Sequence, residues 1–298
     1  MGNSTAQFLQ SSIAKLFKES SLEESEHAHK LMEYQALPQF LSSPPSSFVR
    51  CIISAAAAAA AVCSLHHPYI RSDFVLVKDI SIVNNAGPEG EQAVALRTAG
   101  NFIACLRCSI EGFQDTLYAD EGKNHFFFNC EIYGTIDFIF GAASVVIQNS
   151  TILARRPLDR QYNVITADGR TDTANNAIVI HKCSIIPTPE LKAQSNVKTY
   201  LGRPWKTFSR TIIMQSNIDG FIDSEGWVKF RDSSDVTTLY YAEFWNSGPG
   251  SNTTGRVNWP GFHILTNLDD VQVFTVDKFI NGSEWLKKLD VPYFPGLV

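Results

Sequence analysis

Two aspartates occupy the same position in two neighbouring segments of the sequence. Asp115 lies in GFQDTL (residues 112–117), Asp137 lies in GTIDFIFG (residues 134–141), and each follows a cysteine, Cys108 or Cys130, by seven residues. If the segments are successive coils of a repeat, both carboxylates lie on one face, about 5 Å apart. Two carboxylates that close cannot both ionise freely, so one pKa rises and an acid becomes distinct from a nucleophile. The spacing predicts a hydrolytic site.

A degenerate repeat carries these aspartates. Short alternating apolar runs recur along the chain, and an isoleucine shared by all of them falls at residues 82, 110, 132, 152, 185 and 218, with steps of 28, 22, 20, 33 and 33. Strands that recur at this interval without an intervening helix favour an all-β fold, a right-handed single-stranded parallel β-helix in which each coil covers the next. An antiparallel sandwich, whose strands also alternate, is the alternative.

The cysteines fit the same alignment. Cys108 and Cys130 fall in one column of adjacent coils, which predicts Cα atoms about 5 Å apart and a disulfide between them. Cys183 falls in that column too, but Ser150 intervenes, so we expect a free buried thiol there. The other interpretation leaves all six cysteines reduced in the core.

Composition excludes several classes of partner. The 298 residues include 44% hydrophobic and 18% charged residues, and the net charge of −5 gives no reason to expect nucleic acid or an anionic membrane as a partner. Residues 1–6 lack the basic start and apolar core of a secretory signal. The longest apolar run, residues 51–65, is mostly alanine and too short to span a bilayer. No zinc spacing is present, so we expect no metal and no cofactor.

Residues 1–66 do not share the repeat and are predicted as a helical or irregular N-terminal extension to a β-helix domain of residues 67–298. Residues 7–33 have helical periodicity, and a Ser/Pro linker lies at residues 42–47. The alanine run at residues 55–61 is either a helical cap over the open end of the solenoid or a low-complexity tract.

Four motifs in order resemble those of the pectin methylesterase (pectinesterase) family. They are QAVALR at residues 92–97, GFQDTLY at 112–118, DFIFG at 137–141 and LGRPWK at 201–206, within a resemblance that covers about residues 70–298. The resemblance implies a right-handed parallel β-helix. It also implies hydrolysis of the C6 methyl ester of galacturonate units in pectin, with release of methanol.

The resemblance assigns five polar residues to the reaction. Asp137 is the nucleophile, and Asp115 protonates methanol and then activates water. Arg203 holds Asp137 ionised, and Gln92 and Gln114 donate to the oxyanion.

The resemblance also assigns four aromatic residues to the substrate groove, namely Tyr118, Phe140, Trp205 and Trp227, each of which has packing as its alternative role. It implies a secreted monomer of the plant cell wall that binds pectin and is open to a proteinaceous pectinesterase inhibitor. Four sequons, at Asn3, Asn149, Asn252 and Asn281, are compatible with a glycoprotein.

The sequence departs from the family pattern at its start. The first coils that precede residues 71–88 in family members, with their Gly-x-Tyr-x-Glu stretch, have no counterpart, and residues 8–41 resemble instead the end of an inhibitor-like pro-region. We therefore expect a plant-type enzyme that lacks its first coils. Two alternatives remain open: an inactive or unstable truncated fragment that at most binds pectin, and a β-helical polygalacturonase or lyase.

Overall fold

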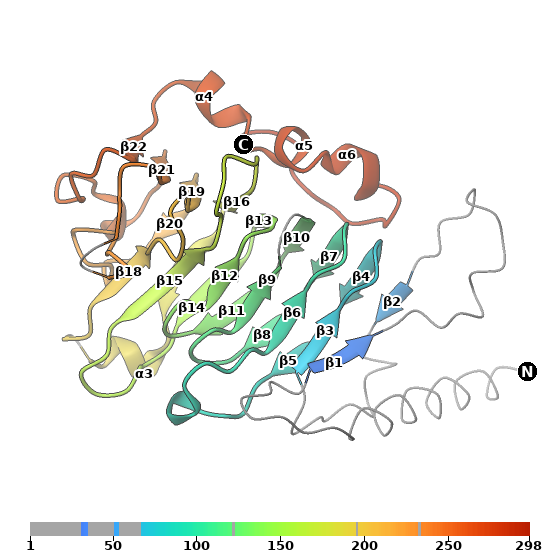
Figure 1. The fold of residues 1–298 in the computed structure, drawn as a ribbon, viewed down its shortest axis with the longest axis horizontal. Helices are drawn as coiled ribbons and strands as arrows, with labels where there is room; N and C mark the ends of the chain where they lie inside the picture. The colour runs from blue at the N-terminus through green and yellow to red at the C-terminus, as the bar shows by residue number, and fades with distance from the viewer. Residues whose placement is uncertain (1–30, 35–50, 54–66, 121–122, 195, 232–233) are drawn as a thin grey trace, which may run out of the picture.

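The chain winds into a stack of coils whose strands form three parallel sheets (Figure 1). The computed structural model describes residues 31–34, 51–53, 67–120, 123–194, 196–231 and 234–298. Every pairing between named strands is parallel, and neighbours in a sheet come from successive coils. This arrangement confirms the predicted parallel β-helix and excludes the antiparallel sandwich.

Sheets A, B and C each take one strand from most coils. Sheet A contains β1 (Leu31–Tyr34), β3 (His67–Ile70), β6 (Leu96–Thr98), β9 (Leu117–Ala119), β12 (Ile139–Gly141), β15 (Asn163–Asp168) and β18 (Thr199–Gly202). Sheet B contains β2 (Cys51–Ile53), β4 (Val75–Lys78), β7 (Ile103–Leu106), β10 (Asn124–Phe128), β13 (Ser144–Gln148), β16 (Ala177–His181), β19 (Arg210–Met214), β21 (Tyr240–Phe244) and β22 (Phe262–Ile264). Sheet C contains β5 (Ser81–Val83), β8 (Ser109–Glu111), β11 (Glu131–Gly134), β14 (Thr151–Ala154), β17 (Ser184–Pro187) and β20 (Asn217–Ile218).

The isoleucine column sets the register of sheet C. Each of the six isoleucines pairs with the next, from Ile82 opposite Ile110 to Ile185 opposite Ile218. All six side chains are buried. Because a slip of one residue would turn this column to solvent, its burial fixes the alignment of every coil. The predicted repeat is confirmed at each of these positions.

Sheet B is buried on both faces. Its inward residues, such as Ile178 and Ile180, join the core inside the coils, while outward residues such as Val179 pack under the C-terminal segment. That segment contains α4 (Leu268–Gln272), α5 (Val276–Phe279) and α6 (Gly282–Trp285), drawn in red in Figure 1. Among the described residues, three further short helices lie elsewhere: η2 (Pro88–Gly90), α3 (Pro189–Lys192) and η3 (Pro249–Ser251). The outer face of sheet A is not covered by the C-terminal segment, and it carries the candidate site.

Cys108 and Cys130 are free, buried cysteines, so the predicted disulfide between them is wrong. The two residues do stack in adjacent coils, since the Cys108 backbone N–H donates to Cys130 Sγ at 3.5 Å. Both lie in the short turns between strands, and side chains at equivalent positions of adjacent coils point the same way, about 4.8 Å apart, whereas a disulfide needs Cβ atoms that converge to about 3.8 Å. Both thiols donate to backbone carbonyls instead. Cys183 is a free buried thiol, as predicted.

Within residues 1–66 the structure describes β1 and β2, and both are strands. They pair with β3 and β4 and extend sheets A and B by one strand each. The solenoid therefore includes residues that we had assigned to a helical or irregular extension. The predicted helix over residues 7–33, the Ser/Pro linker and the alanine run otherwise lie outside the described residues, and the division at residue 66 stays a prediction. Among the described residues, no helix has the length and apolar character that a bilayer span requires.

Candidate active site

The two aspartates lie in equivalent turns of adjacent coils. Asp115 lies two residues before β9, and Asp137 lies two residues before β12. These two strands pair in register. The Asp115 backbone N–H donates to the Ile136 carbonyl at 2.9 Å, which joins the two turns directly. Both aspartates have a positive φ, 61° and 51°. Aspartate tolerates this left-handed conformation better than most residues, and such positions are enriched at functional sites.

Crowding around the preceding glycine fixes the Asp137 turn. A Cβ atom at Gly134 would lie 2.1 Å from Phe138 Cβ and 2.8 Å from the Phe113 carbonyl oxygen. Gly112 stands at the same position before Asp115, where a Cβ would lie 2.7 Å from Thr116 Oγ1. The shared glycine three residues before each aspartate therefore has a packing reason, because the chain approaches the neighbouring residues too closely for a side chain.

Arg203 pairs with one aspartate only. Its Nε and Nη2 donate to the two carboxylate oxygens of Asp137 at 2.8 and 2.6 Å. Arg203 follows β18, two strands beyond β12 in sheet A, so the pair joins coils that are not adjacent. Such a bidentate pair holds the carboxylate both ionised and oriented. The predicted partnership of Arg203 and Asp137 is present.

The surroundings separate the two carboxyl groups. Burial, together with the charge of Asp137, raises the pKa of Asp115 to about 7, and the charge of Arg203 opposes that rise. Burial also raises the pKa of Asp137, but the hydrogen bonds and charge of Arg203 oppose it. Among the described residues, none donates a hydrogen bond to the Asp115 carboxyl group, whereas Asp137 receives two from a cation. The shared proton therefore belongs on Asp115.

The two glutamines are brought together beside the aspartates. Gln92 and Gln114 form a parallel β-bridge, and the Ala93 backbone N–H donates to the Gln114 carbonyl at 3.1 Å. Gln114 directly precedes Asp115, and Gln92 stands at the corresponding turn of the preceding coil, before β6. Gln92 is exposed and Gln114 is half-buried. Two uncharged amide donors thus lie next to two carboxyl groups, as an ester hydrolase requires for its oxyanion.

Three of the four predicted aromatic residues form one surface on the outer face of sheet A. Tyr118 in β9 pairs with Phe140 in β12, and the rings stack with centroids 4.6 Å apart and an interplanar angle of 7°. Trp205 meets Phe140 edge-on at 6.0 Å. Phe140 is 9% exposed, while Tyr118 and Trp205 are half-buried. Tyr118 lies three residues after Asp115, and Phe140 lies three residues after Asp137, so the aromatic surface adjoins both aspartates.

Trp227 is a core residue, which corrects the prediction that its ring lines the same surface. It is only 1% exposed and stacks on Tyr241 with ring centroids 4.3 Å apart. Its indole N–H donates to Glu243 at 3.3 Å. Because Trp227 stands in a bridge with Gly202, it supports the site from inside rather than from the surface.

Two neighbours of Arg203 escaped the sequence analysis. The Arg203 guanidinium lies 4.4 Å from the ring centroid of Phe230, and its Nη1 donates to Tyr162 Oη at 3.4 Å. Both residues come from loops of other coils, and no spacing in the sequence joins them to Arg203. Arg97 lies inside the QAVALR motif, and its guanidinium sits 4.8 Å from the Tyr118 ring centroid, so position alone could have suggested a role for it. Within the described part of the chain, no three His, Cys, Asp or Glu side chains form a group suited to a metal ion.

Comparisons with known proteins identify the family of this chain. Residues 50–283 match the family model described as Pectinesterase. Pectinesterase 2 of Citrus sinensis is 48% identical over 230 residues, which are 76% of this chain and 45% of that protein. Pectinesterase 3 of Solanum lycopersicum is 48% identical over 225 residues, covering 75% of this chain and 41% of that protein. The chain thus spans less than half the length of these curated relatives.

Solved structures give the same result. The pectin methylesterase from carrot superposes with a TM-score of 0.76 at 42% identity, over 83% of this chain and 79% of that one. The pectin methylesterase from Aspergillus niger superposes with a TM-score of 0.61 at 27% identity, over 80% of this chain and 74% of that one. On the family match, which covers well over half of its residues, this chain belongs to the pectinesterase family.

Proposed function

We propose that this chain hydrolyses the C6 methyl ester of galacturonate units in pectin, which yields methanol and a free carboxylate. The observation that carries the proposal is the asymmetric aspartate pair: two carboxyl groups in register on adjacent coils, with Arg203 bound to Asp137 alone. Ester hydrolysis needs a nucleophile for the carbonyl carbon and a proton donor for the departing methoxy oxygen, and this pair supplies one of each.

The reaction follows from these positions. The Asp137 carboxylate attacks the ester carbonyl carbon, and the oxygen that becomes negative accepts hydrogen bonds from the Gln92 and Gln114 amides. The tetrahedral intermediate then collapses, the C–O bond to the methoxy group breaks, and Asp115 gives its proton to the departing methanol. Water attacks the resulting anhydride while Asp115, now ionised, accepts a water proton. Asp137 and the galacturonate carboxylate are released.

The aromatic surface supports a sugar polymer as substrate. Tyr118, Phe140 and Trp205 together present flat rings beside the aspartates, on a sheet face that the C-terminal segment does not cover. Rings of this kind stack on the apolar faces of sugars and exclude water from the reacting ester. The relatives from carrot and Aspergillus niger are named pectin methylesterases, and the substrate proposed here is the one in their names.

We extend the proposal to the setting of the enzyme. We propose that the chain is a secreted enzyme of the plant cell wall, where pectin is found. Several Arabidopsis thaliana relatives are named probable pectinesterase/pectinesterase inhibitor, which supports a proteinaceous inhibitor as a further partner. We propose that the chain acts as a monomer, without a nucleic-acid or membrane partner. Three sequon asparagines, Asn149, Asn252 and Asn281, are exposed, which is compatible with a glycoprotein.

Methanol release from methylated pectin by the purified chain tests the activity. We expect release by the wild type, loss of at least about 1000-fold with Asp137→Ala, and normal release with Asp159→Ala. Asp159 is the matched control because its side chain is 89% exposed. Release that survives Asp137→Ala contradicts the mechanism. A folded wild-type chain without activity identifies a non-catalytic relative, and new reducing ends without methanol identify a chain-cleaving enzyme.

A further inference from the structure

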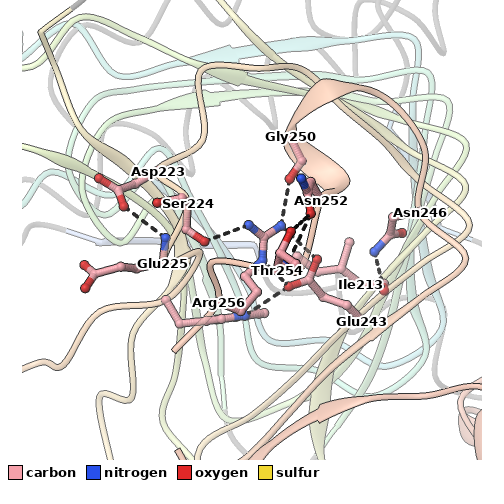
Figure 2. A network of polar contacts seen from close by, with 11 residues as sticks. Ile213, Asp223, Ser224, Glu225, Glu243, Asn246, Gly250, Asn252, Thr254 and Arg256 are labelled. Atoms are coloured by element: carbon pink, nitrogen blue, oxygen red, sulfur yellow. Dashed lines mark hydrogen bonds and ion pairs between the residues drawn. The ribbon is translucent and has the colours of Figure 1, made fainter. Parts of the chain in front are cut away.

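A buried ion pair joins strand β21 to the loop that follows η3. Arg256 Nε donates to Glu243 Oε1 at 2.7 Å and Nη2 donates to Oε2 at 3.1 Å, while both side chains are 2% exposed. The same guanidinium donates to the Gly250 carbonyl at 2.7 Å and to the Ser224 carbonyl at 3.2 Å (Figure 2). The Arg256 side chain therefore joins three separate segments of the chain, through the Glu243 carboxylate and through the Gly250 and Ser224 carbonyls.

Glu243 also connects the ion pair to Trp227. Its Oε1 accepts from the Trp227 indole N–H as well as from Arg256. Gly226, next to Trp227, has a φ of 68°, and a Cβ atom there would lie 2.4 Å from Arg256 Cδ. Both ends of the ion pair thus pack directly on the Gly226–Trp227 step.

The Gly226–Trp227 step in turn lies against the backbone that carries Arg203. Trp227 forms a parallel bridge with Gly202, and the Val228 N–H donates to the Gly202 carbonyl at 3.1 Å. A Cβ atom at Gly202 would lie 2.9 Å from Trp227 Cζ3. Gly202 directly precedes Arg203. The contact between the indole and Gly202 therefore fixes the backbone position from which the Arg203 side chain extends.

The same segment also reaches the Arg203 side chain. Phe230, three residues after Trp227, places its ring centroid 4.4 Å from the Arg203 guanidinium. Residues 226–230 therefore contact Arg203 twice, through its backbone neighbour and through its charged group. The ion pair packs against the other end of this segment, and it therefore holds both contacts with Arg203 in position.

We propose that Glu243 and Arg256 are positioning residues for the esterase site, which act through Trp227 and residues 226–230 to hold Arg203 in its bidentate geometry on Asp137. The inference deepens the proposed function and rests on it. A buried ion pair adds little net stability over apolar residues of the same volume, so its contribution here is the direction that its fixed hydrogen bonds impose. A misplacement of about 1 Å at a reacting group is enough to slow an enzyme strongly.

Glu243→Gln is the main test, with Arg256→Lys as the milder variant and Phe230→Leu as a variant that leaves the ion pair intact. We expect kcat on methylated pectin to fall about tenfold in Glu243→Gln, with KM within about twofold, because substrate contacts are untouched. A weaker Arg203 contact raises the pKa of Asp137, so the acid limb of the pH–rate profile moves to higher pH. Arg256→Lys keeps the charge but loses the fork, and we expect about a threefold loss of kcat.

Trp285→Phe is the control for stability alone, since Trp285 in α6 is buried in the cluster between the C-terminal segment and sheet B. Equal changes of kcat and of the acid limb in Glu243→Gln and in Trp285→Phe would overturn the inference. A crystal structure of Glu243→Gln, or of Arg256→Lys if the former does not fold, gives a readout independent of activity. Displacement of Arg203 from Asp137 supports the inference, and unchanged 2.6 and 2.8 Å contacts overturn it, even where the wild type releases no methanol and the proposed function fails.

Discussion

Two residues of one type have different surroundings here, which is why the proposed mechanism gives them different roles. Asp115 and Asp137 share a backbone conformation, a turn position and a preceding glycine. Only Asp137 receives the two hydrogen bonds of Arg203, and Asp115 is partly buried beside the charge of Asp137. In the proposed mechanism, the division between acid and nucleophile is therefore set by one arginine that lies two coils away from Asp137.

The pH profile of kcat/KM should show this division. Asp115 must carry a proton when methanol leaves, and because its pKa is raised to about 7, activity should decline as the pH rises above about 7. Methanol release measured between pH 4 and pH 9 checks the limb. In Asp115→Asn, which can donate no proton, we expect a loss of at least about 100-fold and no limb near pH 7. A variant that retains the wild-type limb would assign that proton to another group.

Replacing Arg203 by lysine tests the bidentate contact. A lysine keeps the positive charge near Asp137 but has no planar fork, so the carboxylate loses its orientation and part of its stabilisation. We expect kcat to fall about tenfold or more and the acid limb to move to higher pH, as the pKa of Asp137 rises. Steady-state kinetics across the acid range measure both effects. A wild-type kcat in Arg203→Lys would show that charge alone suffices.

At the scale of the strand and turn, the sequence repeat predicted which residues of successive coils lie opposite one another. The isoleucine column gave the correct register in sheet C because one buried face per strand leaves no other alignment. The same alignment placed Cys108 and Cys130 in one column correctly, yet the disulfide does not follow. Register fixes which residues stack, whereas a disulfide also needs Cβ atoms that converge, and side chains at equivalent turn positions of adjacent coils point the same way.

Thiol labelling checks the correction. Cys105, Cys108, Cys130 and Cys183 are free and buried, so the native protein should resist an alkylating reagent at all four. Unfolding in denaturant without a reductant should expose them, and peptide mass spectrometry should then find all four alkylated. The reduced sample is the control. A Cys108–Cys130 peptide that remains linked without reductant contradicts the structure.

The glycine before Asp137 is an element-scale requirement. In Gly134→Ala the added Cβ would meet Phe138 and the Phe113 carbonyl at well under 3 Å, so the turn must shift and carry Asp137 with it. We expect a destabilisation of about 3 kcal/mol or more, measured by denaturant unfolding, and a loss of methanol release larger than the loss of folded protein. Gly296→Ala is the control, because a Cβ there meets nothing within 4 Å.

Contacts between distant loops explain what the sequence analysis missed. Tyr162 and Phe230 reach Arg203 from separate coils, and both lie in loops outside the named strands. The family resemblance assigns Trp227 to the substrate groove, but Tyr241 and Glu243 from the next coil contact its ring and hold it in the core. Periodicity reports on the face to which a residue belongs within a strand; for residues in loops it carries no such information.

At the scale of the whole molecule, sheets A and B have different roles. The outer face of sheet B contributes to stability, and the outer face of sheet A carries the proposed active site. The outer face of sheet B is closed by α4, α5 and α6, whose apolar residues form one cluster with the outward residues of β7, β10 and β16. The outer face of sheet A carries the aspartates, glutamines and aromatic rings. A solenoid can afford this division because each coil contacts only its neighbours, so opposite faces evolve different surfaces on one frame.

Trp285→Ala tests that division. Trp285 is 1% exposed, packs with Phe102 and donates its indole N–H to the Ile280 carbonyl at 2.9 Å, all on the sheet B side. Its truncation leaves a large cavity and should lower the free energy of unfolding by about 3–5 kcal/mol. Because no site residue contacts this cluster, KM and the pH profile of the folded variant should match the wild type. Denaturant unfolding and methanol release well below the melting temperature measure the two quantities separately. A changed KM at unchanged folded fraction would mean that the C-terminal segment reaches the chemistry through the core, and the separation of faces would then be wrong.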